Sequence, residues 1–129
     1  MLQTLKLTGL PCGDLIVFGF RPDNGAPPNC SVAYKAGPFT QDASGKPVQI
    51  AGTAFLRVRC EPARSYDPET GVTTYKAPKQ ISTAGLRRVV GMASTGDFEG
   101  VMSWVIGVNG RLPFHAAATA DGRLVIGIF

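Results

Sequence analysis

The sequence predicts an all-β protein, either an antiparallel β-sandwich or a strongly curved or closed β-barrel of about eight to ten short strands. Short apolar segments recur along the chain with turn residues between them. The 16 Gly and 10 Pro indicate turns between strands rather than disorder, because 44% of the residues are apolar. At 129 residues, the chain is expected to form one domain, 1–129, with its own core.

Each predicted strand is an apolar or alternating run that ends at residues favouring turns. In chain order, the strands are expected at 2–9, 14–20, 30–36, 47–50, 53–60, 72–76, 86–93, 100–108, 112–119 and 123–129. Asn109-Gly110 and Asp121-Gly122 are typical of tight type I′ hairpins, so the last three strands should form a meander. Helical signals are weak, and we expect at most a turn or two at 62–70.

The alternation of side chains predicts which strands are buried. One face of 53–60 is apolar and carries Ala54, Leu56, Val58 and Cys60. Its other face carries Phe55, Arg57 and Arg59, so this strand should be half exposed. By contrast, both faces are apolar in 15–20, 101–108 and 124–128, which we expect to be buried on two sides.

Glycines inside the predicted strands indicate close approaches or sharp coiling of the sheet. They are Gly19, Gly91, Gly107 and Gly127. We expect a bulge or contact with a large neighbour such as Trp104, itself a core residue, and the alternative is that these glycines open a pocket.

Charge and hydropathy exclude several classes of partner. The net charge is +4 and the Lys and Arg residues are scattered, which is unlike a nucleic-acid-binding stripe. No apolar run is long enough for a membrane span. Because no export signal is seen, the expected localisation is cytoplasmic as the chain stands, or extracytoplasmic if Met1 stands where a signal peptide has been removed. A homodimer is left open.

Three cysteines, Cys12, Cys30 and Cys60, cannot all pair within one molecule, and none has the spacing of a metal site. We favour free thiols over one disulfide with a spare thiol.

The sequence gives little basis for catalysis. His115 is the single histidine, and neither Ser103 nor Cys60 lies in a nucleophile signature. We therefore expect no catalytic residue, no metal site and no cofactor, and the chain is more easily understood as a non-enzyme.

Several residues are candidates for binding. Arg57 and Arg59 share a face with Phe55, which suits carboxylates or sugars, although their stems could simply cover apolar surface. Tyr66 and Tyr75 flank the acidic loop 67–69 and could stack on a ligand.

Asp97 and Glu99 are also candidates for ligand binding, because they are spaced two apart and lie on one side of an extended chain. The simpler alternative is that Asp97 bonds turn backbone and Glu99 pairs with an arginine of 53–60.

Three segments carry a resemblance to a known family. They are Gly52-Thr53-Ala54-Phe55-Leu56-Arg57-Val58-Arg59-Cys60-Glu61-Pro62-Ala63, then Gly96-Asp97-Phe98-Glu99-Gly100-Val101 with Trp104, Ile106 and Gly107, and then Pro113-Phe114 with Arg123-Leu124-Val125-Ile126. Over about 12–129 the chain resembles the actinobacterial AMIN-like domain, a relative of the N-terminal targeting domain of cell-wall amidases. The resemblance implies a β-sandwich that binds and does not catalyse.

The sequence is therefore compatible with two functions. The first is a non-catalytic module that recognises a polymer, such as cell-wall glycan, or a protein partner. The second is a small β-barrel that encloses an apolar small molecule and promotes an isomerisation or cyclisation by shape. A filled core with an exposed arginine and aromatic surface would favour the module, whereas an enclosed apolar pocket would favour the enzyme.

Overall fold

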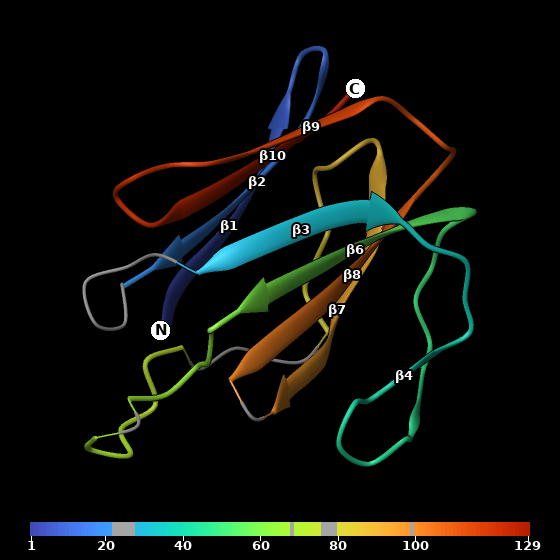
Figure 1. Ribbon diagram of the computed structural model, residues 1–129. Coiled ribbons are helices and arrows are strands. Elements are labelled where there is room, and N and C mark those ends of the chain that lie inside the picture. Colours follow the sequence, from blue (N-terminus) through green and yellow to red (C-terminus); the bar gives the residue numbers. More distant parts are fainter. Residues whose placement is uncertain (22–27, 68, 76–79, 99) are drawn as a thin grey trace.

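The chain forms two packed antiparallel sheets and a small third sheet (Figure 1). The computed structural model describes residues 1–21, 28–67, 69–75, 80–98 and 100–129. The strands are β1 (Leu2–Leu10), β2 (Gly13–Phe20), β3 (Asn29–Tyr34), β4 (Phe39–Thr40), β5 (Pro47–Val48), β6 (Ala54–Glu61), β7 (Val89–Phe98), β8 (Val101–Val108), β9 (Phe114–Ala118) and β10 (Arg123–Ile128).

The strand order is β1-β2-β10-β9 in one sheet and β3-β6-β8-β7 in the other, with β4 and β5 forming a separate ribbon. Strands of both main sheets run along the same diagonal in Figure 1, as in an aligned sandwich. Neither sheet closes on itself, so the barrel alternative is wrong and the sandwich is confirmed.

The core lies between the two main sheets and is filled by large apolar side chains. Ile16, Phe18 and Ile126 of the first sheet and Leu56 and Ile106 of the second are fully buried. Trp104 is 4% exposed and meets Phe18 edge-on at a ring-centroid distance of 5.9 Å, which confirms its core placement.

The last three strands do not form the expected meander. Both neighbours of β8 are already occupied, by β6 and β7, so β9 cannot pair with it and joins the other sheet. Asn109 anchors this crossing, because its backbone N–H bonds the carbonyl oxygen of Arg88 and its side chain bonds that of Arg87. Only the β9–β10 hairpin is as predicted, with Gly122 at a φ of 91°.

Other boundaries differ from expectation. Strand β7 continues through Phe98, five residues beyond the expected end at 93, and Gly100 adopts a positive φ just before β8. In place of the expected strand 72–76, Thr73 makes one isolated bridge with Tyr66, and residue 76 lies outside the described residues. No helix occurs among the described residues of 62–70. The short strand β4 was not expected.

The two-sided burial predicted for 101–108 is confirmed, and the segment between β3 and β6 explains it. Ser103 and Val105 face away from the core yet are each 1% exposed. The segment 41–52 covers them, with the backbone N–H of Asp42 bonded to Thr95 and its carboxylate accepting from the Ser103 hydroxyl at 3.3 Å. The outward side chains of 15–20 are only half-buried.

Two of the in-strand glycines permit this covering. A Cβ at Gly107 would overlap the carbonyl oxygen of Ala51, and one at Gly91 would lie 2.8 Å from it. The structural interpretation of these glycines is therefore confirmed, but their close neighbour is backbone of the covering segment and not Trp104.

Asp14 joins the two main sheets. Its side chain is fully buried, and its carboxylate accepts backbone N–H groups from Arg87 at 3.2 Å, Arg88 at 2.6 Å and Val89 at 2.8 Å. Asp14 belongs to β2 and Val89 begins β7, so one carboxylate links strands of opposite sheets.

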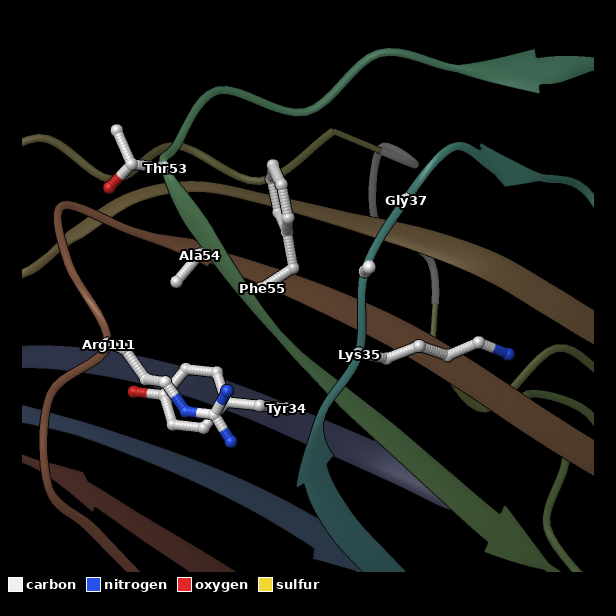
Figure 2. A pocket seen from close by; sticks show the side chains of 8 residues that line it. Tyr34, Lys35, Gly37, Thr53, Ala54, Phe55 and Arg111 are labelled. Atoms are coloured by element: carbon white, nitrogen blue, oxygen red, sulfur yellow. The ribbon is translucent and has the colours of Figure 1, made fainter.

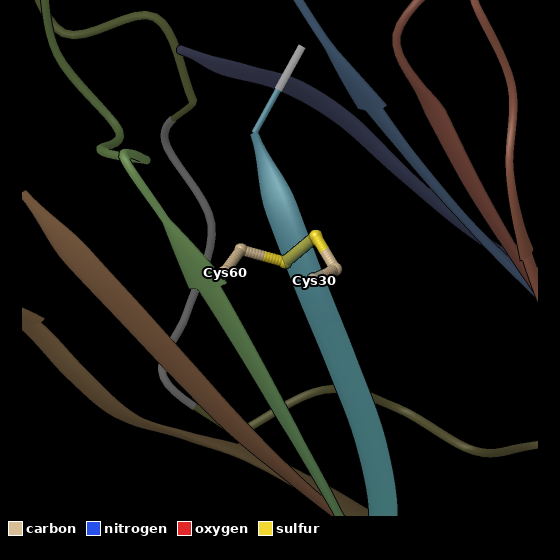
Figure 3. The surroundings of a disulfide bond; sticks show 2 residues. All are labelled: Cys30 and Cys60. Atoms are coloured by element: carbon tan, nitrogen blue, oxygen red, sulfur yellow. A yellow bond between two sulfur atoms is a disulfide. The ribbon is translucent and has the colours of Figure 1, made fainter.

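The preference for three free thiols is wrong. Cys30 and Cys60 face each other across β3 and β6 with their Cα atoms 4.1 Å apart, and they form a disulfide (Figure 3). Cys12 is free and exposed. The sequence did not show this pairing because it does not show that strands 30 residues apart are neighbours.

Candidate binding face

The outer face of β3 and β6 is the part of the second sheet that the 41–52 segment leaves open. From β6 it presents Phe55, Arg57 and Arg59, as the alternation predicts, while Leu56 and Val58 are fully buried. Ser31, Ala33 and Lys35 extend it from the edge strand. Register sets Ser31 beside Arg59 and Ala33 beside Arg57, and the N–H of Lys35 bonds the carbonyl oxygen of Phe55. We call these six residues the β3–β6 face.

Three hollows follow the β3–β6 face from one end to the other. The first, of about 490 Å³, lies between Asn29 and Pro62 and shares Ser31 and Arg59 with the second, of about 200 Å³. The second shares Tyr34 and Lys35 with the third, of about 400 Å³. Because neighbouring hollows share residues, they form one shallow furrow along the edge strand.

The furrow is cationic. Arg59 makes an ion pair with Glu61 at 3.4 Å, but both side chains are about half exposed, and such surface pairs contribute little. Lys35 and Arg57 have no ion-pair partner within the described part of the chain. The furrow therefore offers positive charge that a ligand can use.

The furrow ends near Lys35 in the third hollow, which we call the cleft. Tyr34 at the end of β3 and Arg111 in the β8–β9 connection form one wall, and Thr53, Ala54 and Phe55 form another. Figure 2 shows the Arg111 guanidinium lying across the Tyr34 ring, with its carbon 5.0 Å from the ring centroid. No sequence signal marked Tyr34, Lys35 or Arg111, because only the crossing of the β8–β9 connection brings them together.

The predicted binding residues divide between this face and another part of the molecule. Arg57 and Arg59 lie on the β3–β6 face, next to Phe55. Tyr66 and Asp97 lie elsewhere, near the β7–β8 turn, where Asp97 accepts the backbone N–H of Ser65 at 3.2 Å and also its hydroxyl. Asp97 therefore bonds backbone of a distant segment instead of its own turn. Glu99 lies outside the described residues.

Tyr75 and the acidic loop are held by internal contacts. The Tyr75 ring packs edge-on against Trp104 at 6.4 Å, and burial raises the pKa of its hydroxyl. The N–H of Glu69 bonds Asp67 and lowers the pKa of that carboxyl, with Arg21 at 3.1 Å adding to the effect. These contacts favour a structural role over ligand stacking.

The conceivable nucleophiles are engaged in other bonds. Cys60 is in the disulfide, and the Ser103 hydroxyl donates to Asp42. Among the described residues, no three His, Cys, Asp or Glu side chains converge as metal ligands would. His115 is exposed on β9, in the other sheet from Ser103.

The fold and this face define a small antiparallel β-sandwich with a cationic furrow on one sheet. The chain belongs to the AMIN-like domain family, whose match covers residues 2–129. This confirms the resemblance and extends it to almost the whole chain. Membership favours a non-catalytic binding module over an enzyme. Comparison with curated proteins and with solved structures gave no match. Within the described ranges, no helix has the length and apolar character of a membrane span.

Proposed function

We propose that this protein is a non-catalytic module that binds a linear, negatively charged polymer, such as an acidic cell-wall glycan, along the β3–β6 face. The observation that carries the proposal is the continuous cationic furrow. It follows the six residues of β3, which corresponds to about 20 Å of extended strand. An extended furrow fits a chain better than a compact metabolite.

The chemistry of the furrow supports a polyanion. Arg57 and Arg59 lie two residues apart on one strand face, so their charges recur about every 6–7 Å along it. Guanidinium groups bind carboxylates and phosphates bidentately, and the neighbouring Phe55 ring adds a half-buried apolar surface. A repeating anionic chain is complementary to this pattern.

The enclosed-pocket enzyme has no comparable support. Phe18, Trp104 and Ile126 occupy the space between the sheets and are at most 4% exposed. The three hollows of the furrow open at the surface along β3 and β6, and none of them is lined by Phe18, Trp104 or Ile126. Among the described residues, these open hollows offer an apolar substrate no enclosed site.

The compartment is part of the proposal. A Cys30–Cys60 disulfide favours an oxidising environment, since thiols in the cytosol are kept reduced. We therefore place the working protein outside the cytoplasm, where a cell-wall polymer would be accessible. Alkylation of free thiols in protein taken from its native compartment tests this, because only Cys12 should react before reduction.

Cosedimentation with purified insoluble cell wall, and titration with a soluble acidic polysaccharide, test the binding function. The double variant Arg57→Ala with Arg59→Ala should bind at least about tenfold more weakly, because it loses charge-assisted hydrogen bonds. Binding should also weaken as salt is raised.

The matched control is Lys6→Ala with Arg87→Ala, which removes the same charge from exposed positions on β1 and just before β7, away from the furrow. It should bind like the wild type. Equal affinity of the two double variants, or no polymer binding by the wild-type protein, would refute the proposal.

A further inference from the structure

The cleft at the Lys35 end of the furrow differs from the rest of the furrow, because its arginine, Arg111, belongs to a segment that is held in place. The Tyr34 hydroxyl donates to the carbonyl oxygen of Leu112 at 2.5 Å, and the Tyr34 ring packs edge-on against Phe114. Asn109 fixes the other side of the same connection through its bonds to Arg87 and Arg88. Arg111 thus projects from a connection that is hydrogen-bonded on both sides of it, at Asn109 and at Leu112.

Arg111 is also available to a ligand. Its side chain makes no ion pair within the described residues, and its face rests on the Tyr34 ring at 5.0 Å. Stacking on an aromatic ring leaves the in-plane N–H groups of a guanidinium free to donate hydrogen bonds. A stacked arginine also loses less side-chain conformational entropy on binding than an unstacked one. Two such N–H groups match the two oxygens of one carboxylate.

The remaining lining fits a sugar ring better than an extended peptide or a bare anion. Phe55 contributes an apolar side chain, packed edge-on against Phe39 at 5.3 Å. The Thr53 hydroxyl donates to the carbonyl oxygen of Val108 at 3.4 Å, which leaves its lone pairs to accept from a ligand hydroxyl. The volume of about 400 Å³ falls within the usual range for small-ligand sites.

We infer that this cleft is a subsite for one acidic sugar unit, whose carboxylate is bound by the Arg111 guanidinium while Lys35 adds positive charge. The inference rests on the proposed function, since it names the chemistry of one unit of the polymer in the furrow. Specificity for carboxylated over neutral glycans then comes from Arg111, whereas Arg57 and Arg59 supply the general attraction of the furrow.

The test uses three small probes and chemical-shift titration of the full chain: methyl galacturonoside, its neutral methyl ester, and acetate. The uronoside should give saturable shifts at the Arg111 Nε–H and at the amides of Lys35 and Thr53. The ester should bind at least about tenfold more weakly because it lacks the charge-assisted pair. Acetate should also bind more weakly, because it cannot contact Phe55 or Thr53.

The informative variant is Arg111→Lys, which keeps the charge and loses the planar fork. It should bind the uronoside about tenfold more weakly, whereas the matched control Arg87→Lys should bind like the wild type. The absence of saturable shifts would overturn the inference, as would ester binding equal to that of the uronoside, or full affinity in Arg111→Lys. Acetate binding equal to that of the uronoside would overturn the sugar assignment.

These outcomes separate the two proposals. Polymer binding that depends on Arg57 and Arg59, together with no uronoside binding, would overturn the subsite and leave the furrow intact. Uronoside binding at Arg111 without any polymer binding would overturn the polymer module instead.

Discussion

The substitution Asp14→Ala should be one of the most destabilising single changes in this protein. The carboxylate accepts three backbone N–H groups, and the bond to Val89 is buried while those to Arg87 and Arg88 are partly buried. A buried donor left without a partner costs about 1–3 kcal/mol. Water can partly replace the acceptor at the two partly buried groups, so the expected loss is about 3–5 kcal/mol in the free energy of unfolding.

Asp14→Asn should lose less, about 2–3 kcal/mol, because its one oxygen can keep the two shortest bonds but without charge assistance. Urea unfolding at neutral pH, with the disulfide intact, measures both losses, and the slope with denaturant should not change. Glu69→Ala is the matched control, since it removes the same charge at an exposed position, and it should shift stability by less than about 0.5 kcal/mol. An Asp14→Ala variant within about 1 kcal/mol of the wild type would refute the reasoning.

Two further stability predictions follow from the core and the crosslink. Trp104→Ala should cost about 3–5 kcal/mol in urea unfolding, because it empties the space beside Phe18 and Tyr75; near-native stability would contradict the core placement. Replacing Cys30 and Cys60 together by Ser should cost about 3–4 kcal/mol, since the crosslink closes a loop of about 30 residues in the unfolded chain. A loss under about 1 kcal/mol would show that the disulfide does not act through the unfolded state.

Sequence reasoning succeeded where a strand's own pattern carries the information. The alternation in 53–60 placed Leu56 and Val58 inside and Arg57 and Arg59 outside, as found, because a pleated strand fixes these directions locally. The doubly apolar 101–108 predicted two-sided burial for the same reason. Asp14 could have been found in this way, because it lies in phase with the buried Ile16 and was the one charge on that face.

The remaining features depend on which strands become neighbours, and no local pattern reports that. Asn109-Gly110 has hairpin chemistry, yet β8 has no free edge, so tertiary pairing overrides the turn preference. The disulfide requires β3 beside β6, and the cleft requires the β8–β9 connection to pass Tyr34. Each of these is a long-range consequence of strand order.

Uneven covering of one sheet explains why the open cationic face lies on β3 and β6. The 41–52 segment lies against β7 and β8, where Gly91 and Gly107 remove the side chains that would hold it away. On β6 the corresponding outward positions carry Phe55, Arg57 and Arg59, whose bulk and charge prevent the same close backbone approach. The 41–52 segment therefore stops beside these residues. It leaves the cationic β3–β6 face uncovered, with β3 as the edge strand. Within the described residues this face carries three cations and one ion pair, between Arg59 and Glu61, so its excess positive charge supports the proposed binding of an anionic chain.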